Sequence, residues 1–277
     1  MRLRLGARCW DLRTRALVMG ILNRTPDSFY DRGANWEMDA FLARAESMVA
    51  EGADILDVGG VTAGPGPVVS VAEELERVVP AVEALAARFE VAISVDTWRA
   101  EVAGAAYAAG AVLGNDISGF ADPDFLATAA AGGASVVATH IRLGPRVPDP
   151  DPVYADVVGE VCDRLVGLAV RALEAGIAPE RVLVDAGLDL GKTPEQSLAL
   201  LRASDRLAAL GHPLVVSASN KAFLGGVLGL ALDQRREASL AAAAIAVARG
   251  ARMVRTHDVA GVRRVCATLA AVAEAGE

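Results

Sequence analysis

A strict alternation of short apolar runs with longer amphipathic stretches extends through the whole chain. The apolar runs predict β-strands buried on both faces, because they are continuous and rich in aliphatic residues. They cover residues 16–22, 54–58, 92–95, 112–113, 135–138, 182–184, 214–216 and 253–254. Helical patterns follow at residues 38–52, 71–89, 99–110, 124–131, 153–176, 194–210, 233–250 and 259–275. Strands and helices in this order predict either a closed parallel barrel or a long doubly wound sheet.

Polar residues at the ends of the predicted strands favour the barrel. They include Asn23, Asp57, Asp96, Asn115, His140, Asp185, Ser217, Ser219, Arg255 and His257. In an open sheet only the strands near the switch point need such ends, whereas all eight strand ends of a barrel converge on one site. No glycine fingerprint of a dinucleotide fold follows the first strand. We therefore predict an α/β protein, a single (β/α)8 TIM barrel over residues 1–277, with a short hairpin at residues 3–12 that closes its floor.

Composition excludes several classes of partner. The formal net charge is −8, whereas nucleic acids and anionic membranes attract basic surfaces. No apolar run reaches the ~18 residues that a membrane span needs, and residues 1–10 lack the apolar core of a signal peptide. The three cysteines, Cys9, Cys162 and Cys266, have no metal-binding or redox spacing and predict reduced thiols. We expect a cytoplasmic protein.

Four polar residues at or just beyond the strand ends form the first candidate site: Asp96, Asn115, Asp185 and Lys221. Buried carboxylates need donors, and a heterocycle with an amino group beside a ring N–H supplies two donors in one plane. The amide of Asn115 can donate and accept, and Lys221 can donate to a ring carbonyl. Asp or Asn at a strand end can also cap the following helix, which explains any one of these residues about as well. It explains the whole set much less well, so we predict a pocket for a flat heterocycle.

Arg255 and His257, at the end of the last predicted strand, form a second candidate site with Asn23 from the first strand. The ends of the last two strands of such barrels commonly hold phosphate, which a guanidinium binds strongly. The amide oxygen of Asn23 is a ligand that Mg²⁺ accepts, so a phosphate-bound Mg²⁺ is expected there. A lone histidine is more often a cap, but Arg255 beside His257 favours a diphosphate site.

Several motifs, in order along the chain, resemble those of dihydropteroate synthases. They are Gly20–Phe29, Gly52–Gly60, Ser94–Thr97, Asn115–Asp116, Asp185–Lys192, Ser219–Lys221 and Arg255–Asp258. The match extends over nearly the whole chain. The resemblance implies a transferase that joins 6-hydroxymethyl-7,8-dihydropterin diphosphate to p-aminobenzoate and releases diphosphate.

The resemblance also assigns roles to the two candidate sites. The residues that would hold the substrate are Thr62, Asp96, Asn115, Asp185, Ser219, Lys221 and Arg255. Those that would act in catalysis are Lys221, Arg255 and His257. Arg255 would stack on the ring and reach the departing phosphate, and His257 would bind the diphosphate. Asn23 would bind it through Mg²⁺, the expected cofactor.

The second loop departs from the family pattern Gly-Gly-Glu-Ser-Thr-Arg-Pro-Gly, because residues 59–66 are Gly-Gly-Val-Thr-Ala-Gly-Pro-Gly. Ala63 and Gly64 stand where the family has threonine and arginine, and Asn220 stands where it has a second arginine. Leu190 replaces a phenylalanine, and Asp189 adds a negative charge where an anionic acceptor would approach. The pterin contacts are kept while acceptor contacts are lost. We therefore predict weakened use of p-aminobenzoate, or a different amine, neutral or cationic.

Two alternatives to a transferase of the dihydropteroate synthase type stay open. One is a divergent pterin-binding homologue without catalysis, alone or paired with an active partner, which the altered second loop favours. The other is a barrel that passes a methyl group between folate and a corrinoid, although the Thr25–Phe29 loop and the Arg255–Asp258 block count against it. A homodimer is also expected, because small residues at 240–248 suit close packing, although a helix packed on the barrel has the same pattern. Lys192 is better explained as a cap or an ion pair than as a substrate contact.

Overall fold

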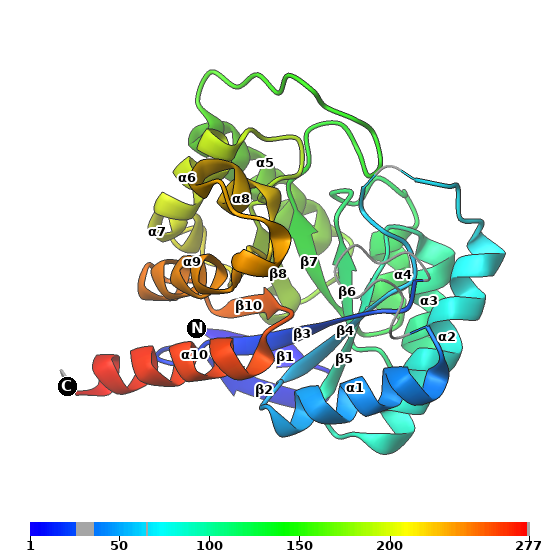
Figure 1. Cartoon of the computed structure of the whole chain (residues 1–277). Coiled ribbons are helices and arrows are strands. Elements are labelled where there is room, and N and C mark those ends of the chain that lie inside the picture. The colour runs from blue at the N-terminus through cyan, green and yellow to red at the C-terminus, as the bar shows by residue number, and fades with distance from the viewer. Residues whose placement is uncertain (26–35, 65, 276–277) are drawn as a thin grey trace.

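Eight parallel strands, β3 to β10, close into a barrel in the order of the sequence. The computed structural model describes residues 1–25, 36–64 and 66–275. Each strand pairs with the next along the chain, and β10 pairs with β3 to complete the ring (Figure 1). The strands are β3 (Leu17–Asn23), β4 (Ile55–Gly59), β5 (Ala92–Asp96), β6 (Leu113–Asp116), β7 (Ser135–Thr139), β8 (Val182–Asp185), β9 (Leu214–Val216) and β10 (Met253–Thr256). The predicted barrel is confirmed.

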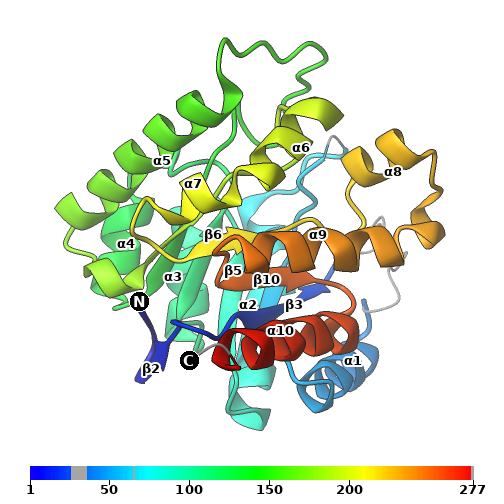
Figure 2. The same ribbon diagram turned by 90° about the vertical axis from the view of Figure 1, so that its left-hand side faces the viewer.

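Helices surround the barrel on its outer face (Figures 1 and 2). They are α1 (Met38–Ala50), α2 (Val71–Arg88), α3 (Ala100–Ala108), α4 (Phe125–Ala131), α5 (Val157–Glu174), α6 (Pro194–Arg202), α7 (Ser204–Ala208), α8 (Ala222–Leu228), α9 (Arg236–Ala248) and α10 (Val259–Glu274). Short 3-10 turns lie at Pro179–Arg181 and Leu232–Gln234. None of the helices in the described part of the chain combines the length and the apolarity that a membrane span requires.

The N-terminal hairpin closes the floor of the barrel, as predicted. Its strands β1 (Arg2–Leu5) and β2 (Arg8–Asp11) pair antiparallel. One buried cluster joins the hairpin to the lowest inward-facing residues of the barrel; it contains Leu3, Leu5, Leu12, Leu17, Met19, Ile55, Leu113, Val137, Leu183, Val215 and Met253. Burying one such side chain contributes about 1.5–3 kcal/mol. The floor is therefore a packed core, and the opposite end of the barrel is left for a site.

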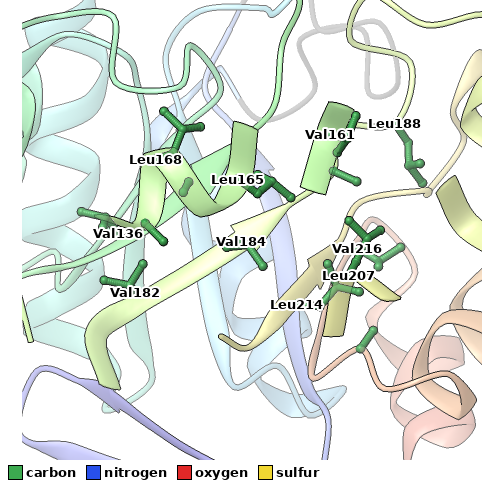
Figure 3. Close-up of a cluster of buried hydrophobic side chains, with 14 of the residues drawn as sticks. Val136, Val161, Leu165, Leu168, Val182, Val184, Leu188, Leu207, Leu214 and Val216 are labelled. Carbon is green, nitrogen blue, oxygen red and sulfur yellow. The ribbon is translucent and has the colours of Figure 1, made fainter. Parts of the chain in front are cut away.

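A second part of the core lies between the strands and the helices. Figure 3 shows one side of it, where Val136 of β7 and Val182 and Val184 of β8 lie near Leu165 and Leu168 of α5. In the same view Leu214 and Val216 of β9 lie beside Leu207 of α7. Leu165 is fully buried. A change such as Leu165→Ala would leave a cavity and cost about 2–5 kcal/mol of unfolding free energy. This packing fixes the strands relative to one another, and with them the residues at their carboxyl ends.

The prediction of one continuous helix at residues 194–210 is wrong. The stretch forms two helices, α6 and α7, with the break at Ala203. The hydroxyl of Ser204 donates to the carbonyl of Leu201 at 2.7 Å, which is a local alternative to the regular helical pattern. The helical spacing of apolar residues does not reveal this break, because Leu200 and Leu207 remain buried on either side of it.

Helix α8 is not indicated by the sequence pattern. Its seven residues include Gly225 and Gly226, which have low helix propensity. Tertiary contacts stabilise it instead: Phe223 is buried, and the guanidinium of Arg235 packs against Gly225 where any larger side chain would collide. Helix α8 follows β9 directly and so positions the end of the loop that carries Lys221.

The alanine-rich helix α9 turns its small residues towards the barrel. The buried residues of this helix are Ser239, Ala242, Ala243, Ala246 and Val247. This packing accounts for the small-residue pattern without a second subunit. The homodimer stays a prediction.

Candidate active site

Polar residues occupy the inward face of the strands, two positions beyond apolar ones. Side chains two apart along a strand share one face, so a polar residue two positions after an interior one also points inward. The pairs are Ile55 and Asp57, Leu113 and Asn115, Leu183 and Asp185, and Met253 and Arg255. The interior therefore changes from apolar to ionisable in a single step along each of these strands.

The mouth of the barrel holds a cavity of about 460 Å³, within the usual range for small-molecule sites. Every residue assigned above to substrate, diphosphate or metal lines it: Asn23, Thr62, Asp96, Asn115, Asp185, Ser219, Lys221, Arg255 and His257. Ile21, Val61 and Ile117 add apolar surface suited to a flat ring. The structure thus brings the expected residues together around one cavity, while their roles towards a ligand stay predictions.

Arg255 bridges two carboxylates across this mouth. Its Nε donates to Oδ2 of Asp57, and a terminal nitrogen donates to Oδ2 of Asp96, each at 2.6 Å. The amide of Asn115 donates to the same oxygen of Asp57 at 3.1 Å. Burial alone would lower the pKa of Arg255, but Asp57 and Asp96 outweigh it and raise that pKa. Arg255 is therefore a fixed cation held by β4 and β5, whereas the family resemblance implies that it stacks on the ring.

Asp185 and Lys221 lie on another part of the wall. Oδ1 of Asp185 accepts from the backbone N–H of Gly187 at 2.7 Å, and Nζ of Lys221 donates to the carbonyl of Leu188. Burial raises the pKa of Asp185 and lowers the pKa of Lys221, and in each case the other group opposes the shift. The carboxylate of Asp185 and the ammonium of Lys221 therefore have less contact with water than they would have in solution. A ligand that donates to the carboxylate and accepts from the ammonium stabilises both.

His257 and Ser219 form the part of the cavity nearest β10. The Ser219 hydroxyl lies 3.0 Å from Nδ1 of His257 and accepts from the His257 backbone N–H at 3.2 Å. A hydroxyl that accepts there and donates to Nδ1 assigns the ring proton to Nε2. Burial, with Arg255 close by, lowers the pKa of His257 to about 3, so the ring is neutral at neutral pH. A neutral imidazole carries one N–H donor and Arg255 carries a positive charge, a combination of groups that suits an anion.

Lys192 supports the loop after β8. Its Nζ donates to the carbonyls of Gly187 and Leu190, both at 2.9 Å, and lies 3.0 Å from Nδ1 of His140. Burial lowers the pKa of Lys192 to about 7 and that of His140 to about 3. These contacts agree with a structural explanation for Lys192, because its ammonium binds main-chain atoms of the loop.

Three residues of the site have no role in the sequence-based predictions. Asp57 anchors Arg255, and the buried hydroxyl of Thr139 lines the cavity with no hydrogen-bond partner among the described residues. Arg235 lines the cavity and donates to the carbonyls of Asn220 and Lys221. The two-residue alternation could have identified Asp57 and Thr139, because each lies two positions after an interior residue. No sequence signal marks Arg235, which lies in the turn before α9.

The donor set near Asn23 suits a cation that arrives with a phosphate. No group of three or more His, Cys, Asp or Glu side chains in the described ranges could hold a metal by itself. Asn23 supplies one amide oxygen to the cavity that Arg255 and His257 also line. Mg²⁺ typically takes one or two protein oxygens and fills its shell with phosphate oxygens and water. The residues present fit that mode. Residues 26–29 of the first signature lie outside the described residues.

Beside Gly64 of the altered second loop the cavity has open space, on the side where the resemblance places the acceptor. A Cβ added at Gly64 would meet no atom within 4 Å. Asp189 stands near this opening, with Oδ2 accepting from the backbone N–H of Phe223 at 3.2 Å. Its backbone is left-handed, with φ of 66°. Gly64, where the family has an arginine, borders this open space. Asp189 adds its negative charge at the same opening.

Comparisons with known proteins identify the family of this chain. Residues 19–257 match the family described as pterin binding enzyme. A protein of Mycobacterium leprae (strain TN), named inactive dihydropteroate synthase 2, is 46% identical over 266 residues, covering 93% of this chain and 91% of the relative. The dihydropteroate synthase of Escherichia coli (strain K12) is 42% identical over 262 residues, covering 92% of both chains.

Solved structures give the same result. Dihydropteroate synthase of Yersinia pestis, in a sulfonamide drug complex, superposes with a TM-score of 0.94 at 38% identity, covering 99% of this chain and 100% of that one. The Xanthomonas albilineans enzyme with 4-aminobenzoic acid superposes with a TM-score of 0.89 at 39% identity, covering 98% of each chain. This chain therefore belongs to the pterin-binding enzyme family, among the dihydropteroate synthases and their close homologues.

Proposed function

We propose that this chain is a transferase of the dihydropteroate synthase type with altered use of the acceptor. It binds 6-hydroxymethyl-7,8-dihydropterin diphosphate, transfers the pterin methylene group to an amine, and releases diphosphate. The observation that carries the proposal is one cavity of about 460 Å³ that combines a ring-binding set, Asp96, Asn115, Asp185 and Lys221, with an anion-binding set, Arg255 and His257.

The ring-binding set suits the polar edge of a pterin. The aminopyrimidine side offers N–H donors to Asp185 and Asp96, and the ring carbonyl accepts from Lys221. Asn115, with its carbonyl free to face the ring while its amide donates to Asp57, matches a mixed edge. The desolvated charges of Asp185 and Lys221 support this, because ligand hydrogen bonds would replace the water they lack.

The anion-binding set suits the departure of diphosphate. The bond from the pterin methylene carbon to the diphosphate oxygen breaks, and the electron pair stays on that oxygen. The amine nitrogen then forms the new C–N bond and loses a proton. Arg255 contributes a permanent positive charge and His257 a neutral N–H donor, so negative charge that develops on the leaving group is stabilised. Asn23 would hold Mg²⁺ together with the substrate diphosphate, and the ion would supply further charge neutralisation.

The acceptor side is where this chain differs from an ordinary synthase. Ala63, Gly64 and Asn220 carry no charge, and Asp189 lies beside the opening. Losing a charge-assisted bond weakens binding by about 1.5–3 kcal/mol. We therefore expect weak use of p-aminobenzoate. A homodimer in the cytoplasm is part of the same proposal; the three cysteines are free thiols, which suits that compartment.

A pterin-binding homologue without catalysis is the second candidate. The weakened acceptor side favours it, as do Mycobacterium relatives that are named inactive. The retained Arg255 and His257 favour the transferase, because a pterin binder needs no anion site.

Diphosphate release separates the two candidates. The protein is incubated with the pterin diphosphate and Mg²⁺, with and without a panel of primary arylamines, and diphosphate is assayed. Release that depends on an amine supports the transferase. Saturable pterin binding with no amine-dependent release supports the non-catalytic homologue.

A further inference from the structure

A second cavity adjoins the pterin cavity on the acceptor side. Its volume is about 250 Å³, and it shares Ala63, Gly64, Asp189 and Leu190 with the larger one. These four residues therefore form the boundary where the two cavities meet. The far wall comes from the loop after β7 and includes Arg146.

Arg146 lies beside the altered second loop. Its backbone N–H donates to the carbonyl of Ala63 at 3.2 Å, and its guanidinium donates to the carbonyl of Pro67 at 2.7 Å. Neither carbonyl carries a charge. Asp149, an acidic residue that also lines this cavity, already forms an ion pair with Arg142. Arg146 therefore keeps a cationic group at the far end of the cavity, supplied by a different loop from the one that lost its arginine.

Asp189 and Arg146 impose an order of groups on a ligand that extends outward from the pterin cavity. Asp189, shared by both cavities, accepts hydrogen bonds and repels an anion. Arg146, farther out, favours an anion or a strong acceptor. A carboxylate attached directly to an aryl ring meets the acid first, whereas an amide N–H followed by a carboxylate meets the two groups in matching order.

We propose that this second cavity is the subsite for an extended substituent on the amine acceptor. The acceptor class is an arylamine whose ring carries an amide-linked acidic group. This inference rests on the proposed function, because it identifies the acceptor of that same site. Ala63, Gly64 and Arg146 are then the residues that determine acceptor length.

Gly64→Arg is the most direct test, because a side chain at this position enters open space and the backbone is not left-handed. The new side chain fills space at the boundary of the two cavities and restores a charge for a short carboxylate. Gly167→Arg is the matched control, since Gly167 is exposed on α5 and a Cβ there also meets nothing within 4 Å. Arg146→Gln removes the distal charge, and Arg146→Lys keeps it.

The measurement is the affinity of 4-aminobenzoate and of 4-aminobenzoylglycine for the full chain saturated with 6-hydroxymethylpterin, diphosphate and Mg²⁺. We expect the longer amine to bind at least about tenfold more tightly, Gly64→Arg to reverse this order, and Gly167→Arg to leave it unchanged. Arg146→Gln should weaken only the longer amine, and Arg146→Lys should largely preserve its affinity. Equal affinities, no binding of either amine, or no effect of Gly64→Arg on their ratio would overturn the proposal. Diphosphate release, assayed in parallel, tests the proposed function separately, because the acceptor preference is read from binding alone.

Discussion

Arg255 on β10 donates to Asp96 on β5 across the mouth of the barrel, at 2.6 Å. Asp96 is also one of the residues expected to hold the pterin. The same carboxylate would therefore position Arg255 and bind the ligand. Asp57 is the second anchor of the same guanidinium and is fully buried. The cation of the proposed leaving-group site is thus positioned before any ligand binds.

Replacing Arg255 with methionine should destabilise the protein. The change leaves the buried carboxylate of Asp57 without its cation, and breaking a buried ion pair in this way costs about 3–5 kcal/mol. Denaturant unfolding measures the loss. Arg249→Met is the control, because its ion pair with Asp205 is at the surface and at 3.5 Å, where the cost is below about 1 kcal/mol. Equal unfolding free energies for the two variants would contradict the anchoring role of Arg255.

The two lysines of the chain should separate ligand binding from stability. Lys221→Met should weaken pterin binding at least about tenfold, because a buried charge-assisted bond to the ring is lost. Lys192→Met should mainly lower the unfolding free energy, by about 1–3 kcal/mol, because the carbonyls of Gly187 and Leu190 lose their donor. Titration calorimetry and denaturant unfolding of both variants give the comparison. An unchanged pterin affinity in Lys221→Met would show that the ring site is wrongly assigned.

His257 should make stability depend on pH below neutrality. Its pKa in the folded protein is about 3, well below the ordinary value of 6.5, so the unfolded chain binds this proton first as the pH falls. The contribution of His257 to the unfolding free energy is therefore fully present above about pH 6.5. It is lost as the pH falls towards 3, by up to about 1.4 kcal/mol per pH unit for one proton. His257→Asn should flatten the curve over that window. Raised pKa values of Asp96 and Asp116 act in the opposite direction, but they are common to both proteins and cancel in the difference.

The matched variant for this experiment is His212→Asn. Burial also lowers the pKa of His212, but this side chain is only half-buried. Its replacement should flatten the curve less. A His257→Asn curve parallel to that of the parent protein would rule out a buried neutral imidazole.

Asp189→Asn should improve the binding of p-aminobenzoate. Repulsion between two carboxylates at contact distance is about 1 kcal/mol in water, so the gain is on the order of fivefold. Asparagine tolerates the left-handed backbone at this position and keeps an oxygen for the N–H of Phe223. Affinity for the pterin-loaded protein is the measurement, and Asp205→Asn, an exposed change of the same charge on α7, is the control. The same affinity in parent and Asp189→Asn would mean that Asp189 does not face the acceptor.

The barrel and most of its site could be predicted from the sequence, because strand order and the polar residues at strand ends are local features. Asp96 and Asp185 follow apolar runs directly, and Asn115 follows one after a single glycine, so the convergence of strand ends in a barrel brings them together. Helix α8 could not be predicted, since Gly225 and Gly226 argue against a helix and tertiary packing, including that of Phe223 and Arg235, stabilises it.

The contacts of Arg255 could not be predicted either. Its position at the end of β10 is clear from the sequence, but its choice of Asp57 and Asp96 depends on the width of the closed barrel. The position of Arg146 beside Ala63 likewise depends on how two long loops meet. Such contacts join residues far apart in the chain, and no local pattern records them.

The central claim is that four side chains bind the ring of a pterin: Asp96, Asn115, Asp185 and Lys221. Titration calorimetry of 6-hydroxymethyl-7,8-dihydropterin diphosphate with Mg²⁺ into the full chain, and into Asp185→Asn, tests it most directly. The claim predicts saturable binding at one site per chain, at least about tenfold weaker in the variant, with Asp205→Asn unchanged. No binding to the parent protein, or the same affinity in Asp185→Asn, would contradict it.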